Sequence, residues 1–185
     1  MAFPDDLTPG GPDDLYLLCA ELLDASSSAL ALSRGGTPSR AYVSPGPPAF
    51  DCVAGGQLTV HAGGPIIAET LPLQPPLQPA HRVELGLQLN LVQMTVTVIR
   101  CAVLPQGQTQ RLPDTGLLSQ VAAITMADVW AIWNWVATHK RNQTLFPPKE
   151  RELYMDPAYV LQTQGGAAGW QIPFRVQLNG FRAST

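Results

Sequence analysis

The stretch from Val83 to Val98 constrains the fold more than any other part of this sequence. Apolar side chains occupy every second position up to Leu91, and the alternation resumes one residue out of phase from Val92 onward. A period of two is typical of a β-strand. Because a one-residue shift moves the apolar set to the other face, we expect a bulge or sharp bend near Leu91 and Val92, with the two halves of the strand facing different layers.

Three further segments predict strands. Residues 41–43 form a short run, and residues 58–62 alternate apolar and polar side chains before a Gly-Gly pair that we expect to end the strand. The last alternating segment, residues 170–178, contains Pro173. Proline lacks a backbone donor, so this strand is expected at an edge of the sheet or at a bulge.

Two segments predict helices by their apolar spacing. The first opens at Pro12, Asp13 and Asp14, and the second begins with a cap at Asp114 or Thr115 and runs to about residue 141. Apolar stripes of period 3.6 follow in both. The stripe residues are Leu15, Leu18, Cys19, Leu22 and Leu23 in the first helix, and Leu118, Val121, Ala122, Thr125, Val129, Ile132, Trp133 and Val136 in the second.

Trp130 and Trp135 lie beside the second stripe. We expect both to belong to a wide apolar helix face that packs on a sheet, with an aromatic ligand box as the alternative.

The order of these elements is α-β-β-β-α-β. It predicts an α+β fold, a mainly antiparallel sheet with two long helices packed on one face. We expect a single domain over residues 1–185, in which residues 1–12 are an N-terminal lead and residues 65–79 and 143–166 are long loops.

The composition favours association with other proteins. Charged residues make up 14% of the chain, where about 25% is usual. A surface poor in charge does little to repel a neighbouring copy. The net charge of −3 gives little support to nucleic-acid binding, which requires basic side chains to neutralise phosphates. We therefore expect protein partners, including the chain itself.

Motifs for catalysis are missing from the sequence. There is no glycine-rich phosphate loop and no Gly-x-Ser-x-Gly turn. The histidines and cysteines do not stand at metal-ligand spacing, and the cysteines are expected as small buried apolar residues in a reducing compartment. They are His61, His81, His139, Cys19, Cys52 and Cys101. Asp128 lies within the second helix, where we expect a cap, an ion-pair partner or a solvent-facing residue. The sequence thus predicts a protein that is not an enzyme, without catalytic residue, cofactor or metal.

Four segments carry a resemblance to a known family. They are SPGPPAFDCVAGGQLTV, VTVIRCAVLP, ADVWAIWNWV and GGAAGWQIPFRVQLNGF, and the resemblance covers roughly residues 13–182. In these segments and in its element order the chain resembles the tail terminator proteins of long-tailed bacteriophages (siphoviruses), especially those of actinobacterial phages. The resemblance implies a structural virion protein that is assembled in the host cytoplasm, with no membrane partner.

The resemblance further implies a homohexameric ring on the head-proximal end of the tail tube. The ring would stop polymerisation of the major tail tube protein and present a surface to the head-completion or stopper protein. DNA would pass through its lumen without specific binding. In such proteins the helices lie outside the sheet, and loops between strands contact the tube and neighbouring subunits.

Candidate interface residues follow from apolar or aromatic side chains in predicted loops. They are Leu71, Leu73, Leu77, Tyr154 and Tyr159. Packing into the core is the alternative for each. Two other functions stay open: another neck or minor tail protein, such as a head–tail stopper or connector, and a small hydrolase that uses Asp128, His61 or His81.

Overall fold

The computed structural model describes residues 15–49, 55–68, 89–101, 115–142, 144–146, 152–164 and 167–178. The elements are α1 (Leu15–Ala31), β1 (Arg40–Val43), β2 (Gln57–Ala68), β3 (Leu89–Cys101), α2 (Thr115–Arg141), β4 (Leu153–Met155), β5 (Tyr159–Gln164) and β6 (Ala167–Gln177).

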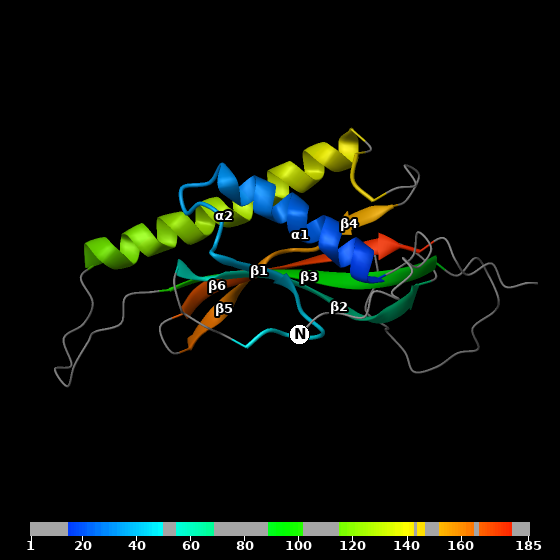
Figure 1. Cartoon of the computed structure of the whole chain (residues 1–185), viewed down its shortest axis with the longest axis horizontal. Helices are drawn as coiled ribbons and strands as arrows, with labels where there is room; N and C mark the ends of the chain where they lie inside the picture. The colour runs from blue at the N-terminus through cyan, green and yellow to red at the C-terminus, as the bar shows by residue number, and fades with distance from the viewer. Residues whose placement is uncertain are drawn as a thin grey trace, which may run out of the picture.

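The described elements form one six-stranded sheet with both helices on the same face (Figure 1). The strand order is β1-β2-β3-β6-β4, and β5 pairs with the same edge of β6 as β4 does. Every pairing is antiparallel except that of β1 with β2. The predicted α+β class and the packing of the helices on one face are confirmed.

The described part of residues 143–166 contains strands that the sequence did not predict. We expected a long loop there, but β4 and β5 both lie within it and extend the sheet beyond β6. Each of these strands is short, and pairing with β6 is what holds it extended. The predicted order therefore gains two strands between α2 and the last strand.

The hydrophobic core lies between the helices and the middle of the sheet. Strands β2, β3 and β6 contribute the residues that face the helices, and α1 contributes one side along its whole length. The fully or nearly fully buried members include Leu18, Cys19, Leu22, Leu30, Leu58, Val60, Val92, Met94, Val96, Ile132, Val136, Ile172, Phe174 and Val176. The predicted apolar stripe of the first helix is confirmed at Leu18, Cys19 and Leu22, whereas Leu15 is exposed.

The predicted bulge near Leu91 and Val92 is wrong in its position. Strand β3 pairs with β6 without interruption from Leu91 to Cys101. Leu91 and Val92 are both fully buried although they point to opposite faces of the sheet. The apolar set thus changes face along an unbroken strand. Residues 83–88 lie outside the described residues.

The irregularity lies instead in the neighbouring strand β2. Ala62 pairs with Met94 and Pro65 with Val92, so the Gly-Gly pair between them opposes a single residue of β3. We expected this pair to end the strand and a loop to begin at residue 65, but β2 continues to Ala68. A bulge absorbs the two glycines and the pairing resumes beyond them. The rest of the predicted loop, residues 69–79, lies outside the described residues.

Pro173 lies neither at an edge of the sheet nor at a bulge, the two positions that we expected for it. Strand β6 lies inside the sheet, with β3 on one side and β4 and β5 on the other. The carbonyl of Pro173 accepts a hydrogen bond from the backbone N–H of Asp156, which lies in the turn between β4 and β5. Pro173 therefore lacks its N–H at a position between β4 and β5, where no strand is present to accept a hydrogen bond from it. The pairing of β6 loses no backbone hydrogen bond.

Candidate functional site

Helix α2 presents apolar side chains on two sides. Thr125, Asp128, Ile132 and Val136 are its buried residues and face the sheet and α1. On the side away from the core lies a second row at positions i, i+3, i+4 and i+7, which we call the outer stripe. It consists of Ala123, Met126, Ala127 and Trp130 and carries no charge.

The outer stripe is largely open to solvent. Trp130 is 65% exposed and Met126 is 56% exposed, so the expectation that Trp130 packs on the sheet is wrong. By length and composition alone, α2 is a helix that could span a membrane. A soluble helix with apolar residues on all sides is normally buried all round. The outer stripe is therefore the strongest candidate for a protein contact among the described residues.

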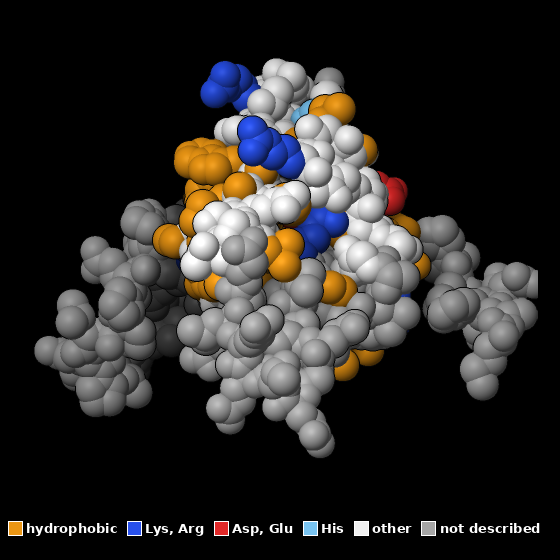
Figure 2. Space-filling model, turned by 90° about the vertical axis from the view of Figure 1, so that its left-hand side faces the viewer, with side chains coloured by type: hydrophobic (Ala, Val, Ile, Leu, Met, Phe, Trp, Pro, Cys, Tyr) orange, Lys and Arg blue, Asp and Glu red, His pale blue; other side chains and the backbone are white. Residues whose placement is uncertain are grey.

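The position of α2 makes this surface accessible. Its N-terminal half reaches past the end of the sheet, on the side where β5 lies (Figure 1). Hydrophobic side chains come to the surface on this end of the molecule, with Lys and Arg side chains beside them (Figure 2). Exposed apolar patches with polar groups around them mark sites of protein contact.

A buried ion pair attaches α2 to the sheet. Arg100 of β3 donates from Nε to Oδ2 of Asp128 at 2.7 Å, and both side chains are at least nine-tenths buried. Ser33 donates to the other carboxylate oxygen at 2.5 Å. Arg100 also donates from Nη2 to the carbonyl of Gly36 at 2.6 Å. Asp128 is thus an ion-pair partner, one of the three roles expected for it, and its oxygens are occupied by structural contacts.

The turn after α1 is shaped by this ion pair. A Cβ atom at Gly35 would lie 2.5 Å from the guanidinium of Arg100 and 2.8 Å from the side chain of Ile124. Gly36 adopts a φ of 63°, the left-handed conformation that glycine adopts without strain. Gly35 and Gly36 therefore serve the ion pair as well as the turn.

Sequence reasoning missed Arg100 as the partner of Asp128, although a signal was present. Arg100 continues the apolar phase of Val96 and Val98 on β3, so it is a lone cation at a core position. Asp128 is a lone anion near the apolar stripe of a helix. Two isolated, opposite charges at core positions predict a buried pair, because neither is stable there without the other.

Trp135 and His139 line a groove between the two helices. Their rings stack with centroids 3.3 Å apart, and Nδ1 of His139 lies 2.8 Å from the carbonyl oxygen of Trp135. The groove has a volume of 380 Å³, and Leu32, directly after the end of α1, lies at its margin. Its walls otherwise consist of small or polar side chains, which suits the packing of a single side chain from another protein.

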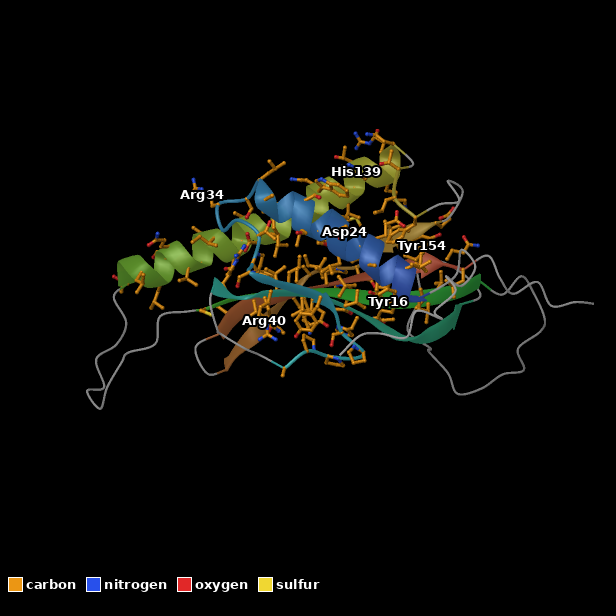
Figure 3. All side chains as sticks on the ribbon, viewed as in Figure 1. Tyr16, Asp24, Arg34, Arg40, His139 and Tyr154 are labelled. Atoms are coloured by element: carbon orange, nitrogen blue, oxygen red, sulfur yellow. The ribbon has the colours of Figure 1, made fainter. Side chains whose placement is uncertain are left out.

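Tyr154 anchors β4 to the end of α2 (Figure 3). Lys140 lies over its ring, 5.3 Å from the centroid, and donates to the carbonyl of Leu153. Burial and a hydrogen bond to Glu152 raise the pKa of Tyr154 to about 12. A groove of 450 Å³ lies beside these residues. Tyr154 was expected in a loop but lies in a strand, with its described contacts within its own chain.

Tyr159 was also expected in a loop but lies in β5, where it is 48% exposed. The neighbouring Val160 is 63% exposed. The other three predicted interface residues, Leu71, Leu73 and Leu77, lie outside the described residues. An interface role for all five remains a prediction.

The face of the sheet opposite the helices is polar yet closely packed. We call it the polar face; Gln57, Thr59 and His61 of β2 point to it and are at most 8% exposed. Gln57 donates to the carbonyl of Ala49 at 2.9 Å. Burial lowers the pKa of His61, and its Nδ1 has no hydrogen-bond partner. This face thus forms a second, polar core layer.

The candidate catalytic residues are not brought together. Asp128 lies on the helix side of the sheet and His61 on the polar face, while His81 lies outside the described residues. Burial raises the pKa of the Cys19 thiol to about 11, which disfavours a reactive thiolate. Among the described residues, no three His, Cys, Asp or Glu side chains gather as a metal site requires.

Comparison with known proteins adds no identification. No protein-family model matches the chain, and a search of curated proteins finds no match.

Proposed function

We propose that this protein is a structural virion protein that forms a ring on the head-proximal end of a phage tail tube. It would stop tube polymerisation and join the tail to the head-completion protein. The observation that carries the proposal is the outer stripe of α2. A helix of 27 residues with four buried residues and an exposed, uncharged apolar row between Ala123 and Trp130 is suited to contact with a protein partner.

Three further features support the proposal. The sequence resembles tail terminators in the segments quoted above, and these include the helix core ADVWAIWNWV, which contains Ala127 and Trp130 of the outer stripe. Both helices lie outside the sheet, on one face of it, and the resemblance implies helices outside the sheet. The low charge of the chain suits packing between subunits.

The test is electron microscopy of particles made when this gene is disabled in the virus that encodes it. We expect headless tails of abnormal, variable length. Tails of normal length that fail to join filled heads would assign the protein to another neck position, such as a stopper. Intact infectious particles would reject the structural function and favour the hydrolase alternative.

Complementation then tests the outer stripe itself. A gene with Trp130→Ser and Met126→Ser is expected not to restore normal tails. Tyr16→Ser is the matched control, because Tyr16 lies on α1, off the stripe, and is 65% exposed, as Trp130 is. Restoration by the stripe variant as complete as that by the control would remove the main support for the proposal.

A further inference from the structure

Strands β1 and β5 are the two outer edges of the described sheet. Among the described strands, none pairs with the outer edge of β1 or of β5. The sequence of β5, YVLQTQ, contains neither a charge nor a proline. Exposed edge strands are usually blocked by such residues, since their free backbone groups otherwise pair with another chain. An uncharged edge with an exposed Val160 is therefore suited to strand addition.

The two edge strands lie at the same level of the sheet. Ala41 of β1 pairs with Leu58, Leu58 with Val98, Val98 with Trp170, and Trp170 with Val160 of β5. In the same way the row through Thr59, Thr97 and Gln171 connects Tyr42 to Tyr159. A second copy related by rotation alone can therefore bring its β1 beside β5 without sliding along the strands.

The strand directions and hydrogen-bonding groups also match. Between β1 and β5 there are three antiparallel pairings and one parallel pairing, so the two strands run in opposite directions. The backbone N–H of Asp156 donates to the carbonyl of Pro173, so Pro173 directs its carbonyl toward the side of β4 and β5. Because the direction alternates along a strand, every second residue of β6 from Pro173 back to Gly169 bonds toward β5. Val160 pairs with a residue of β6 that bonds the other way, so Val160 points its own N–H and C=O outward.

The same argument applies to β1. Ser44 donates to the carbonyl of Val60, so Ser44 and Tyr42 bond inward to β2 and Ala41 points its N–H and C=O outward. The outward groups of the two edges thus lie in the same row, that of Ala41 and Val160.

We propose that β1 of one copy pairs antiparallel with β5 of the next copy, with Ala41 opposite Val160 and Tyr42 opposite Tyr159. Ala41 and Val160 would exchange two backbone hydrogen bonds, and the two tyrosines would form a cross-strand aromatic pair on the polar face. The contact is head-to-tail, so repetition continues the sheet from copy to copy. Only the closure of these contacts into a ring rests on the proposed function.

Disulfide trapping tests the pairing directly. Tyr42→Cys and Tyr159→Cys are combined in one chain, because a directly opposed pair without backbone hydrogen bonds brings the two Cα atoms to about 4.5 Å. The purified protein at high concentration and the assembled particles are both oxidised. We expect a ladder of cross-linked copies on a non-reducing gel, at least tenfold stronger than in the control Leu32→Cys with Tyr159→Cys. A yield no higher than the control in both samples would overturn the pairing.

A proline variant separates pairing from folding. Val160→Pro, added to the Tyr42→Cys and Tyr159→Cys chain, removes an N–H that points outward, so the ladder within the sheet stays intact. We expect an unchanged circular dichroism spectrum and at least a tenfold loss of cross-linking, whereas Val160→Thr in the same chain retains it. Undiminished cross-linking in the folded Val160→Pro variant would contradict the proposed register.

The outcome is independent of the test of function. Cross-linking of the purified protein together with intact particles from the disabled gene would keep the pairing and reject the tail function. Abnormal tails from the disabled gene, together with no cross-linking of the purified protein or the particles, would keep the tail function and reject the pairing.

Discussion

Helices α1 and α2 lie on the same face of the sheet but are held there in different ways. The shorter helix, α1, buries seven residues, almost all apolar, along its 17-residue length. The longer helix, α2, buries four residues, of which Thr125 and Asp128 are polar. Helix α1 is a core helix, whereas α2 is attached by an ion pair and a few apolar contacts. The comparison teaches that an apolar helix pattern indicates how much surface needs covering but not which molecule covers it.

The largest loss of stability is expected on breaking the ion pair that attaches α2 to the sheet. Asp128→Ala leaves Arg100 buried without its partner, and breaking such a pair costs about 3–5 kcal/mol of unfolding free energy. Urea unfolding followed by circular dichroism measures it. Asp24→Ala, an exposed aspartate on α1, is the matched control and is expected to change stability by less than about 0.5 kcal/mol. Equal stability of the two variants would mean that the ion pair does not hold α2.

The next effect concerns the apolar attachment of α1. Leu22→Ala removes a fully buried side chain, which is expected to cost about 2–5 kcal/mol depending on how far the core relaxes. Leu17→Ala is the control, because Leu17 is 43% exposed on the same helix. Thermal unfolding of both variants measures the difference. A similar loss for both would contradict the assignment of α1 as the core helix.

A smaller effect is expected on the polar face, which neither helix covers. Burial lowers the pKa of His61 below its ordinary value of 6.5, so the unfolded chain takes up the proton more readily than the folded chain. His61 therefore costs no stability above pH 6.5, and stability falls as the pH drops below that value. His61→Gln is expected to lose less stability than the wild type between pH 7.5 and pH 5.5 in urea unfolding. An unchanged pH dependence would show that His61 is not the group responsible.

The smallest effect on stability is expected at the outer stripe. Trp130→Ser changes a side chain that is 65% exposed, so unfolding free energy should change by no more than about 0.5 kcal/mol. Ile132→Ala, on the buried side of the same helix, is the contrast and is expected to cost about 2–5 kcal/mol. A large loss of stability in Trp130→Ser would mean that its own chain covers Trp130 and that no partner is needed.

Several elements of the fold could be predicted from local pattern. The bounds of α2, the short strand at residues 41–43 and the buried stripe around Leu18 and Leu22 follow from periodicity and caps. Strands β4 and β5 could not be predicted, because their three and six residues carry too little pattern to indicate a strand. Pairing with β6 decides their conformation.

The candidate site was less predictable than the fold. Tyr159 was selected as an aromatic residue in an apparent loop, and it proves to lie on an exposed edge strand. Trp130 was assigned to the sheet-facing side of its helix and lies on the other side. A broad apolar pattern around a helix does not show which side meets the sheet, so this error could not be avoided from sequence alone.

The sequence by itself determined where helices and most strands form, because periods of 3.6 and 2 are local properties of the chain. Only the tertiary structure decided which faces are covered, that Asp128 meets Arg100 across 28 positions, and that the bulge lies in β2 instead of β3. It also decided that Ala41 and Val160 share a level on opposite edges of the sheet. These features depend on contacts between distant segments, and pattern within one segment carries no information about its partner.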